Sequence, residues 1–586
     1  MVTEALTDKF NQVLNVLMVF VALLALATLV AEYGFYLPAR LLIYANIIDL
    51  IIVGYFLFHV SLKLIIATDR KQYFLNRRME YALASLVIIA FLIFIIKNNF
   101  RFPVYEFIEG KLTEVTKLYL IGFQVYIILN LLLKASSLNQ KVASYQFHPG
   151  QILMASFGFI ILVGTGLLML PRAVAAGESL SLIDALFTAT SATCVTGLIV
   201  VDTGTHFSTL GQGIILALIQ IGGLGLMTYA SFFALVFRRQ ISLKEKSMLR
   251  DMLNYDSLGI ISRLLTYTIL LTLTIESIGA VLLYFSRHLS NLPFGERLFS
   301  AIFHSISAFC NAGFSLYSDS FMSAQQDWLL LLTVCILIIL GGLGFPVLVN
   351  IFRLNVLAGQ TGLKRWSLQT KLVLISSGIL LALGTVAFLF FENGNTLSGM
   401  NTLEKLMHAF FQSVTTRTAG FNTVDIGMIS VPTLLLFLML MFIGASPGST
   451  GGGIKTTTIS VLLAAISSII RGRNRVDLAK RNIPFIVVNR ALVILLFSGV
   501  FIFVMLLILT VSENLPFLDI LFETFSAFGT VGLSRGITPL LSDVGKVVIV
   551  ITMFFGRLGA LTISLALARP DQRAHFDYPS ENIMVG

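Results

Sequence analysis

Four short segments of this chain end on a glycine and recur at a nearly constant interval. They are Ser191–Gly197, Ser307–Gly313, Thr415–Gly420 and Ser526–Gly532, and their last glycines lie 116, 107 and 112 residues apart. Each segment follows a short apolar run and precedes a polar loop and then a long hydrophobic stretch. A period of this size is typical of a repeated supersecondary unit. The chain is therefore predicted to contain four copies of one unit, each carrying a glycine-ended loop.

The residues around these loops are those of a membrane protein. Of 586 residues, 56% are hydrophobic and only 12% are charged, whereas a soluble domain has about 25% charged residues. A helix needs about 20 mostly apolar residues to cross a bilayer. Candidate crossings before the repeats are 13–31, 41–66, 80–97 and 117–134. Within the repeats, the first helices are 151–171, 262–286, 371–391 and 490–511, and the second helices are 209–237, 327–352, 431–470 (interrupted) and 544–568.

These spans predict an all-α integral membrane protein with twelve crossings and four pore loops. The N-terminal four-helix block, residues 1–145, does not share the period, and packing or regulation is its expected role. The pore domain, residues 149–586, holds repeats at about 149–240, 260–353, 370–470 and 489–569. Lys and Arg gather in the loops after the second helices of repeats one to three and in the loop 67–79. Because such basic loops stay in the cytoplasm, both termini are predicted to be cytoplasmic and the glycine loops to open outward.

The four loops have the composition of an ion filter. A filter must replace the water around a cation with fixed oxygens, and glycine tolerates the backbone angles that aim successive carbonyls inward. Asp and Glu are missing from the four segments, which favours carbonyl over carboxylate coordination. The predicted filter residues are Val195, Thr196, Gly197, Asn311, Ala312, Gly313, Thr418, Ala419, Gly420, Thr530, Val531 and Gly532. The alternative is four glycine turns between helices. Cys194 and Cys310, three residues before their glycines, are expected to be packing residues rather than a metal pair.

A second glycine pattern lies in the second helices. Gly-Gly-Leu-Gly occurs at 222–225 and 341–344, repeat four has Gly-Arg-Leu-Gly at 556–559, and repeat three opens a glycine-rich segment at 444–455. A charge in the bilayer is costly unless it faces a polar cavity or partners, and this segment cannot remain a helix facing lipid. The hypothesis is that the segment crosses a water-filled conduit and forms a gate with Arg557. The predicted gate residues are Gly444, Ser446, Gly448, Gly451, Gly452, Gly453, Lys455 and Arg557. Alternatively, Arg557 only caps carbonyls of the loop and has no role in flux.

On these motifs, residues 149–586 resemble the Trk/Ktr/HKT superfamily of potassium transporters, in particular its TrkH/KtrB-like membrane subunits. The C-terminal sequence 578–586 adds to the resemblance. It implies potassium as the transported ion, a homodimer with one pore per subunit, and the loop of repeat three as gate. It also implies a cytosolic nucleotide-binding regulatory subunit (TrkA/KtrA-like) and a bacterial plasma (inner) membrane. Gly197 favours potassium, since members with Ser in the first loop tend to favour sodium.

Other classes of function fit the sequence less well. A secondary solute or cation symporter with a midplane site would explain one interrupted helix but not four glycine loops. No nucleophile–base cluster or metal spacing indicates an enzyme, and neither a cofactor nor nucleic acid is expected to bind. Glu276, in the first helix of repeat two, is another charge in the membrane. It could relay protons or hold a coupling ion, and a buried pair with a neighbour is at least as good an interpretation.

Overall fold

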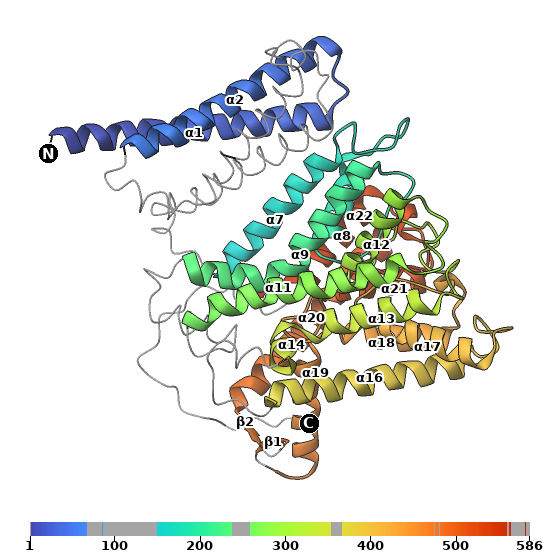
Figure 1. Cartoon of the computed structure of the whole chain (residues 1–586). Helices are drawn as coiled ribbons and strands as arrows, with labels where there is room; N and C mark the ends of the chain where they lie inside the picture. The colour runs from blue at the N-terminus through green and yellow to red at the C-terminus, as the bar shows by residue number, and fades with distance from the viewer. Residues whose placement is uncertain are drawn as a thin grey trace. The chain divides into compact units, whose positions relative to one another are not determined.

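The computed structural model describes residues 2–66, 85, 149–236, 258–352, 366–473, 475–479, 481–559, 562–563 and 581. It contains two compact units. The smaller comprises Met1–Gln146, Gly166–Leu180 and Phe207–Gly211. Its helices α1 (Val2–Gly34) and α2 (Ala39–Ile66) lie side by side in Figure 1 and bury a shared apolar cluster that includes Ala22 and Phe56. These helices confirm the first two predicted spans, and the predicted spans 80–97 and 117–134 lie outside the described residues.

The larger unit comprises Phe147–Thr165, Ser181–His206 and Gln212–Gly586. Four long apolar helices stand where the first helix of each repeat was predicted: α7 (Pro149–Leu168), α11 (Leu258–Tyr284), α16 (Leu368–Glu392) and α20 (Phe485–Ser512). Within the described residues, six helices are long and apolar enough to cross a membrane, or up to seven if one bent pair counts as a single span. The predicted number of twelve crossings includes segments outside the described residues.

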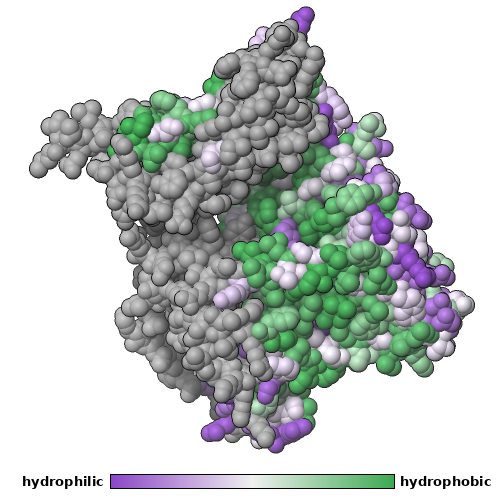
Figure 2. Space-filling view, in the orientation of Figure 1, coloured by the Kyte–Doolittle hydropathy of each residue, from purple (hydrophilic) through white to green (hydrophobic). Residues whose placement is uncertain are grey.

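Large apolar side chains cover the outer faces of the long helices. On α20, for example, Val500 is 63% exposed and Phe503 is 61% exposed. Figure 2 shows hydrophobic residues spread over the face of this unit, and hydrophilic residues gathered along its right-hand edge. Because the largest apolar patch on a soluble monomer is usually only a few hundred square ångströms, an apolar face of this extent indicates contact with lipid. The fold is thus that of an all-α integral membrane protein.

A short helix precedes each of the four glycine segments. These pore helices are α8 (Leu182–Thr193), α12 (Phe294–Phe309), α17 (Thr402–Thr415) and α21 (Phe517–Gly529). Local sequence sets where they begin: the Ser181 side chain accepts the amide of Asp184, and Asn401 forms a capping box with Glu404, which satisfies amides that a helix start leaves free. Each pore helix ends directly at its glycine segment.

The interruption predicted in the second helix of repeat three is confirmed, and the second helices of repeats two and four are also interrupted, against the prediction. The second helices are α9 (Thr209–Val236), α13 (Trp328–Leu343) with α14 (Phe345–Ile351), α18 (Val431–Phe442) with α19 (Thr456–Ile470), and α22 (Asp543–Leu558). The continuous helix predicted over 327–352 is wrong, because α13 and α14 meet at 102°. Likewise, α22 is interrupted at Gly559, after which residues 562–563 are helical again and the rest of the predicted span to 568 lies outside the described residues. Gly344 and Gly559 stand at the two helix ends with φ of +88° and +81°, a region open to glycine but costly for other residues.

Acidic residues connect the C-terminal ends of first helices to the N-terminal ends of second helices in repeats three and four. Both oxygens of the Glu513 carboxylate accept hydrogen bonds from Ser542, the N-cap of α22. One oxygen of the Glu392 carboxylate, Oε1, accepts both the backbone amide and the hydroxyl of Ser430, before α18. Burial alone raises the pKa of Glu513, but the hydrogen bonds from Ser542 outweigh it and hold the pKa below its ordinary value of 4.5. The helix N-terminus adds a favourable dipole, so these carboxylates tie the end of the first helix to the start of the second helix in repeats three and four.

The remaining regular elements are short. Two 3₁₀ helices, η1 (Ile426–Met428) and η2 (Thr538–Leu540), follow the third and fourth glycine segments. One antiparallel hairpin, β1 (Val476–Leu478) and β2 (Arg481–Ile483), follows α19. The pore helices pack against both first and second helices, including α8 against α22 and α17 against α13. The centre of the larger unit is therefore built from the pore helices and their glycine segments.

Candidate functional site

The four glycine segments share one unusual backbone conformation. The last glycine of each has a φ between +70° and +91°. The residue two positions earlier also has a positive φ, although it is not glycine: Val195, Asn311, Thr418 and Thr530 have φ of 57°, 60°, 72° and 48°. Such angles are costly for residues with a Cβ, above all β-branched ones. Alternation of left- and right-handed residues turns successive carbonyls to one side, and a backbone held against this cost is typical of functional sites.

The four glycines also meet in a closed ring. A Cβ added to any of them would come within 2.6 Å of a backbone oxygen of another glycine segment, closer than side chains approach such an atom. The pairs are Gly197 with Ala312, Gly313 with Ala419, Gly420 with Val531, and Gly532 with Thr196. Repeat one therefore contacts repeat two, repeat two contacts repeat three, repeat three contacts repeat four, and repeat four contacts repeat one. The structure thus brings the four glycines together in one ring with the residues that precede them, Thr196, Ala312, Ala419 and Val531.

Hydrogen bonds within each segment hold this conformation. The amides of Gly197 and Gly532 each donate to a serine hydroxyl at 3.1 Å, from Ser191 and Ser526. In the other two segments the hydroxyls of Ser307 and Thr415 donate to carbonyls just after the glycine. All of these hydroxyl-bearing residues are buried. In all four segments, therefore, a hydroxyl near the end of the pore helix bonds the backbone at the glycine or just after it.

Glycines of the second helices allow those helices to approach the ring closely. A Cβ on Gly222, Gly341 or Gly556 would overlap a backbone oxygen four residues before the corresponding filter glycine. These are the leading glycines of the second pattern in repeats one, two and four. The repeated Gly-x-Leu-Gly motif thus places the second helices directly beneath the ring.

In repeat three the same space is filled by the loop 443–455, here called the gate loop. Ile443 and Ile454 form a parallel bridge that closes its ends. The Gly452 amide donates to the Thr530 hydroxyl at 3.0 Å, and the Thr450 hydroxyl donates to the Phe309 carbonyl at 3.3 Å. The loop therefore contacts the undersides of the glycine segments, and the predicted gate residues of 444–455 lie there.

Contact with the gate loop also explains the break in the second helix of repeat two. The Phe345 amide, at the start of α14, donates to the Gly448 carbonyl at 2.9 Å. The Ser446 amide donates to the carbonyl of Gly342 at 3.1 Å. A Cβ on Gly344 would lie 2.7 Å from the Pro447 oxygen. The helix bends because the backbone of the gate loop occupies its straight path.

Two predicted cations hold carbonyls of the gate loop. Arg557 is 1% exposed and donates to the carbonyls of Thr450 in the loop and Gly222 in repeat one. The Lys455 ammonium donates to the Gly451 carbonyl at 2.8 Å. Charged donors bind carbonyls more strongly than neutral ones, so the loop is fastened in its present position. Arg557 caps carbonyls whether it is part of a gate or only a structural residue. A measurement of cation flux in a variant of Arg557 would distinguish the two interpretations.

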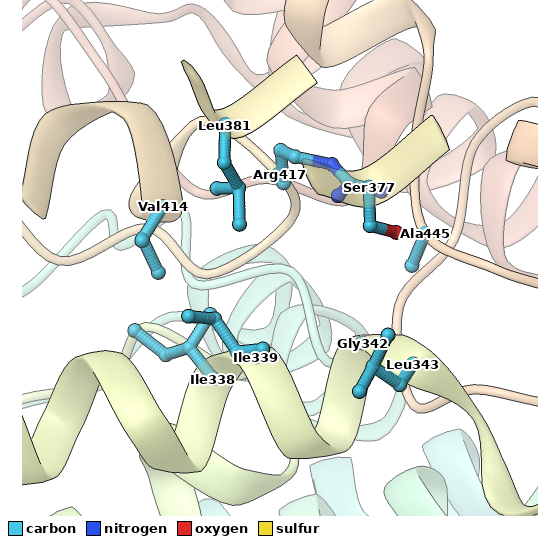
Figure 3. Close-up of a pocket in the computed structure, with 9 residues that line it drawn as sticks. All are labelled: Ile338, Ile339, Gly342, Leu343, Ser377, Leu381, Val414, Arg417 and Ala445. Atoms are coloured by element: carbon cyan, nitrogen blue, oxygen red, sulfur yellow. The ribbon is translucent and has the colours of Figure 1, made fainter. Parts of the chain in front are cut away.

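Sequence reasoning missed a third cation. Arg417, in the third glycine segment, is 9% exposed and donates to the Gly444 carbonyl at 3.4 Å. It borders a cavity of about 20 Å³ behind the gate loop. In Figure 3, Ile338 and Gly342 of α13 line one side of this cavity, and Arg417 lies opposite them beside Ser377. An alignment of the four segments would have indicated this residue. Three residues before the glycine, the other segments have Cys, Cys and Gly, whereas the third has Arg417.

The other polar candidates have ordinary partners. Glu276 is 5% exposed and accepts from the Gln220 side-chain nitrogen at 3.3 Å, so the buried pair is the arrangement found. Cys194 and Cys310 are free thiols and fully buried. No group of three or more His, Cys, Asp or Glu side chains that could hold a metal occurs in the described part of the chain. The predicted C-terminal motif 578–586, apart from residue 581, and the basic loops around 70–78 and 238–250 fall outside it.

Membrane-spanning helices around a ring of re-entrant glycine segments define a polytopic membrane transport protein. The family model described as "TrkH: Cation transport protein" matches residues 115–578. The chain therefore belongs to this family of cation transport proteins.

Individual relatives agree with this assignment. The chain is 41% identical over 443 residues to Ktr system potassium uptake protein B of Bacillus subtilis (strain 168), a match that covers 75% of this chain and 97% of that protein. Ktr system potassium uptake protein B of Vibrio alginolyticus is 40% identical over 438 residues, covering 74% and 94%. Potassium/sodium uptake protein NtpJ of Enterococcus hirae is 38% identical over 454 residues, covering 76% and 99%. These relatives are transport proteins rather than enzymes.

A solved structure has the same fold. The potassium transporter TrkH from Vibrio parahaemolyticus matches with a TM-score of 0.57 and 19% identity, covering 77% of this chain and 89% of that one. At this identity the likeness concerns the fold alone. It independently supports the all-helical membrane architecture.

Proposed function

We propose that this protein takes up potassium ions across the plasma (inner) membrane of a bacterium. The ions would pass through a filter of backbone carbonyls formed by the four glycine segments, with fourfold pseudo-symmetry. The observation that carries the proposal is the closed ring of Gly197, Gly313, Gly420 and Gly532. Carbonyl rings replace the hydration shell of a cation, and relatives that are 41% and 40% identical are named potassium uptake proteins.

The gate loop and Arg557 form the proposed gate. The loop lies directly beneath the ring, and a fixed positive charge on the pathway raises the barrier to a cation. Opening requires the bond from Arg557 to the Thr450 carbonyl to break, whereas the bond from Lys455 to the Gly451 carbonyl lies within the loop and holds its shape. Two arginines outside the loop, Arg557 and Arg417, thus favour the closed position, and Lys455 keeps the loop in the shape that they bind.

Uptake of radioactive rubidium by proteoliposomes loaded with potassium tests the filter. The purified protein is expected to support uptake that potassium suppresses and an equal concentration of sodium does not. Gly532→Ala should abolish the uptake, and Gly158→Ala should not, because a Cβ on Gly158 meets open space. Sodium-stimulated rubidium uptake would favour the alternative, a secondary symporter. Absence of rubidium uptake by a correctly folded protein would refute the proposal.

The assembly completes the proposal. The protein would work as a homodimer with both termini in the cytoplasm, and a cytosolic nucleotide-binding regulatory subunit would bind its cytoplasmic face. The support is membership of the family and the word "system" in the names of two relatives. Copurification from membranes, followed by mass spectrometry, tests for the subunit. Recovery of the membrane protein alone from native membranes would count against it.

A further inference from the structure

Two of the four pore helices carry an ionisable side chain at the same place. His304 in α12 and Glu523 in α21 each stand nine residues before the filter glycine, and their exposed fractions are 2% and 1%. Neither residue belongs to the filter or to the gate loop. No cluster of metal ligands accompanies them in the described part of the chain. The hydrogen-bond partners of His304 and Glu523 indicate why they lie behind the filter.

Each of these side chains bonds the serine two residues after its filter glycine. His304 Nε2 lies 3.1 Å from Ser315 Oγ, and Ser534 Oγ donates to Glu523 Oε2 at 2.8 Å. Both serine oxygens also accept a backbone amide two residues further on, from Tyr317 and Gly536, each at 3.0 Å. The same two-step connection therefore ties the pore helix to the outer part of the loop in repeats two and four.

Repeats one and three lack this connection at these two positions, although His408 of α17 lies 3.0 Å from the hydroxyl of Thr423, three residues after the glycine of repeat three. At the helix position they have Thr188 and Phe411, and at the loop position Ile199 and Asn422. Neither pair can reproduce an ionisable group bonded to a serine. Since the ring runs one, two, three, four, repeats two and four face each other across the axis. The connection through a serine is consequently found in two opposite repeats, two and four, whereas repeat three has the contact between His408 and Thr423.

The histidine of repeat two is held in one protonation state. His304 Nδ1 lies 2.8 Å from the carbonyl of Ser300, which can only accept, so this nitrogen carries the proton. Nε2 accepts the Leu316 amide at 3.3 Å. The imidazole is therefore neutral, with one ring nitrogen as donor and the other as acceptor. The ring also stacks on Tyr317, with centroids 4.9 Å apart, which fixes its orientation.

The glutamate of repeat four reaches both ends of the loop after the filter. One carboxylate oxygen binds Ser534, and the other binds the hydroxyl of Thr538 at the start of η2. The charged neighbours Asp519 and Arg535 pair with each other. The carboxylate is thus a two-armed acceptor between the pore helix and the segment 534–538.

We propose that His304 and Glu523 are positioning residues that fix the outer ends of two opposite filter loops and thereby set the selectivity for the transported ion. The inference rests on the proposed function and deepens it. Because a filter must hold its oxygens at fixed separations to replace a hydration shell, a loop freed at its outer end accepts a smaller, more strongly hydrated ion with less penalty. Loss of the connection should lower discrimination before it lowers total flux.

Serine substitutions provide the sharpest test, because they remove one hydroxyl and leave the pore helix unchanged. The ratio of half-saturating sodium to half-saturating potassium, measured as competition against rubidium uptake in proteoliposomes, is the readout. A hydrogen bond contributes about 1 kcal/mol, so Ser315→Ala and Ser534→Ala should each lower this ratio about fivefold. The maximal rate and the unfolding temperature should change little. Ser534→Thr retains the hydroxyl and should restore the wild-type ratio.

Controls separate this inference from the function on which it rests. Thr188→Val changes the same helix position in repeat one, where the hydroxyl makes no hydrogen bond within the described part of the chain, and should leave the ratio unchanged. Failure of the wild type to take up rubidium overturns the proposed function. Wild-type uptake with a ratio that neither serine variant alters, or that Thr188→Val alters equally, overturns the positioning role alone.

Discussion

Replacing Arg557 with alanine should make the transporter more active. In the structure its guanidinium group donates to the Thr450 carbonyl in the gate loop and to the Gly222 carbonyl in α9. The side chain is 1% exposed, so water does not compete for these acceptors. Removal of the side chain also removes a positive charge beneath the filter. Both effects favour the passage of a cation.

The size of the effect follows from the bond that must break when the loop moves. A hydrogen bond to a charged group contributes about 1.5–3 kcal/mol, and only the bond to Thr450 joins Arg557 to the gate loop in the described structure. A loss of about 2 kcal/mol changes an equilibrium constant about 30-fold, since about 1.4 kcal/mol corresponds to a factor of ten. If the closed position predominates in the wild type, the open fraction and the rate of uptake should rise by about this factor.

Initial rates of rubidium uptake, normalised to the amount of folded protein in the vesicles, provide the assay. Arg297→Ala is the matched control, because Arg297 also donates to a backbone carbonyl, that of Tyr284 at 2.7 Å, but makes no contact with the gate loop in the described structure. The control should retain the wild-type rate. An unchanged or lower rate in a folded Arg557→Ala protein would show that the arginine only caps carbonyls and has no role in flux.

Three further predictions concern the filter, the gate loop and the outer frame. Gly532→Ala should reduce rubidium uptake at least about tenfold, because glycine at φ +91° leaves no room for a Cβ beside Thr196; retention of uptake would contradict the ring. Lys455→Met should raise the rate of uptake, because loss of its bonds to the Gly451 and Gly452 carbonyls loosens the folded shape in which the gate loop blocks the path; a lowered rate in folded protein would argue against this role. Glu513→Gln should lower the unfolding temperature by about 2 °C at neutral pH. Since the pKa of Glu513 is held below 4.5 by Ser542, its stabilisation is complete above that pH and is lost as the pH falls through the folded-state value. The unfolding temperatures of the wild type and Glu513→Gln, measured across this pH range, check this prediction. A difference between the two temperatures that does not change with pH would refute it.

The glycine segments show what local sequence can predict. Positive φ at Gly197 and Gly420 is a requirement that few other residues meet, so a recurring glycine indicates the conformation from the sequence alone. The apolar first helices were equally predictable, because about 20 apolar residues suffice to define a crossing. In both cases the physical cause lies within a few residues of the feature.

The bend at Gly344 and the role of Arg417 depend on contacts distant in sequence. Hydropathy indicates a straight helix through Gly344, and only the Gly448 carbonyl, which lies far along the chain in the gate loop, shows why the helix breaks there. Arg417 bonds the Gly444 carbonyl, which belongs to a loop whose path no local pattern fixes. The serine contacts of His304 and Glu523 are similar, since periodicity cannot indicate which side chains meet behind a filter.

The proposed function depends above all on an ion site at the common axis of the four glycine segments. Anomalous diffraction from crystals of the wild-type protein grown with thallium or rubidium in place of potassium tests for this site directly. We expect anomalous density inside the ring, surrounded by the carbonyls of Thr196, Ala312, Ala419 and Val531, and loss of this density in Gly532→Ala crystals. Well-diffracting wild-type crystals with no density inside the ring would contradict the proposal.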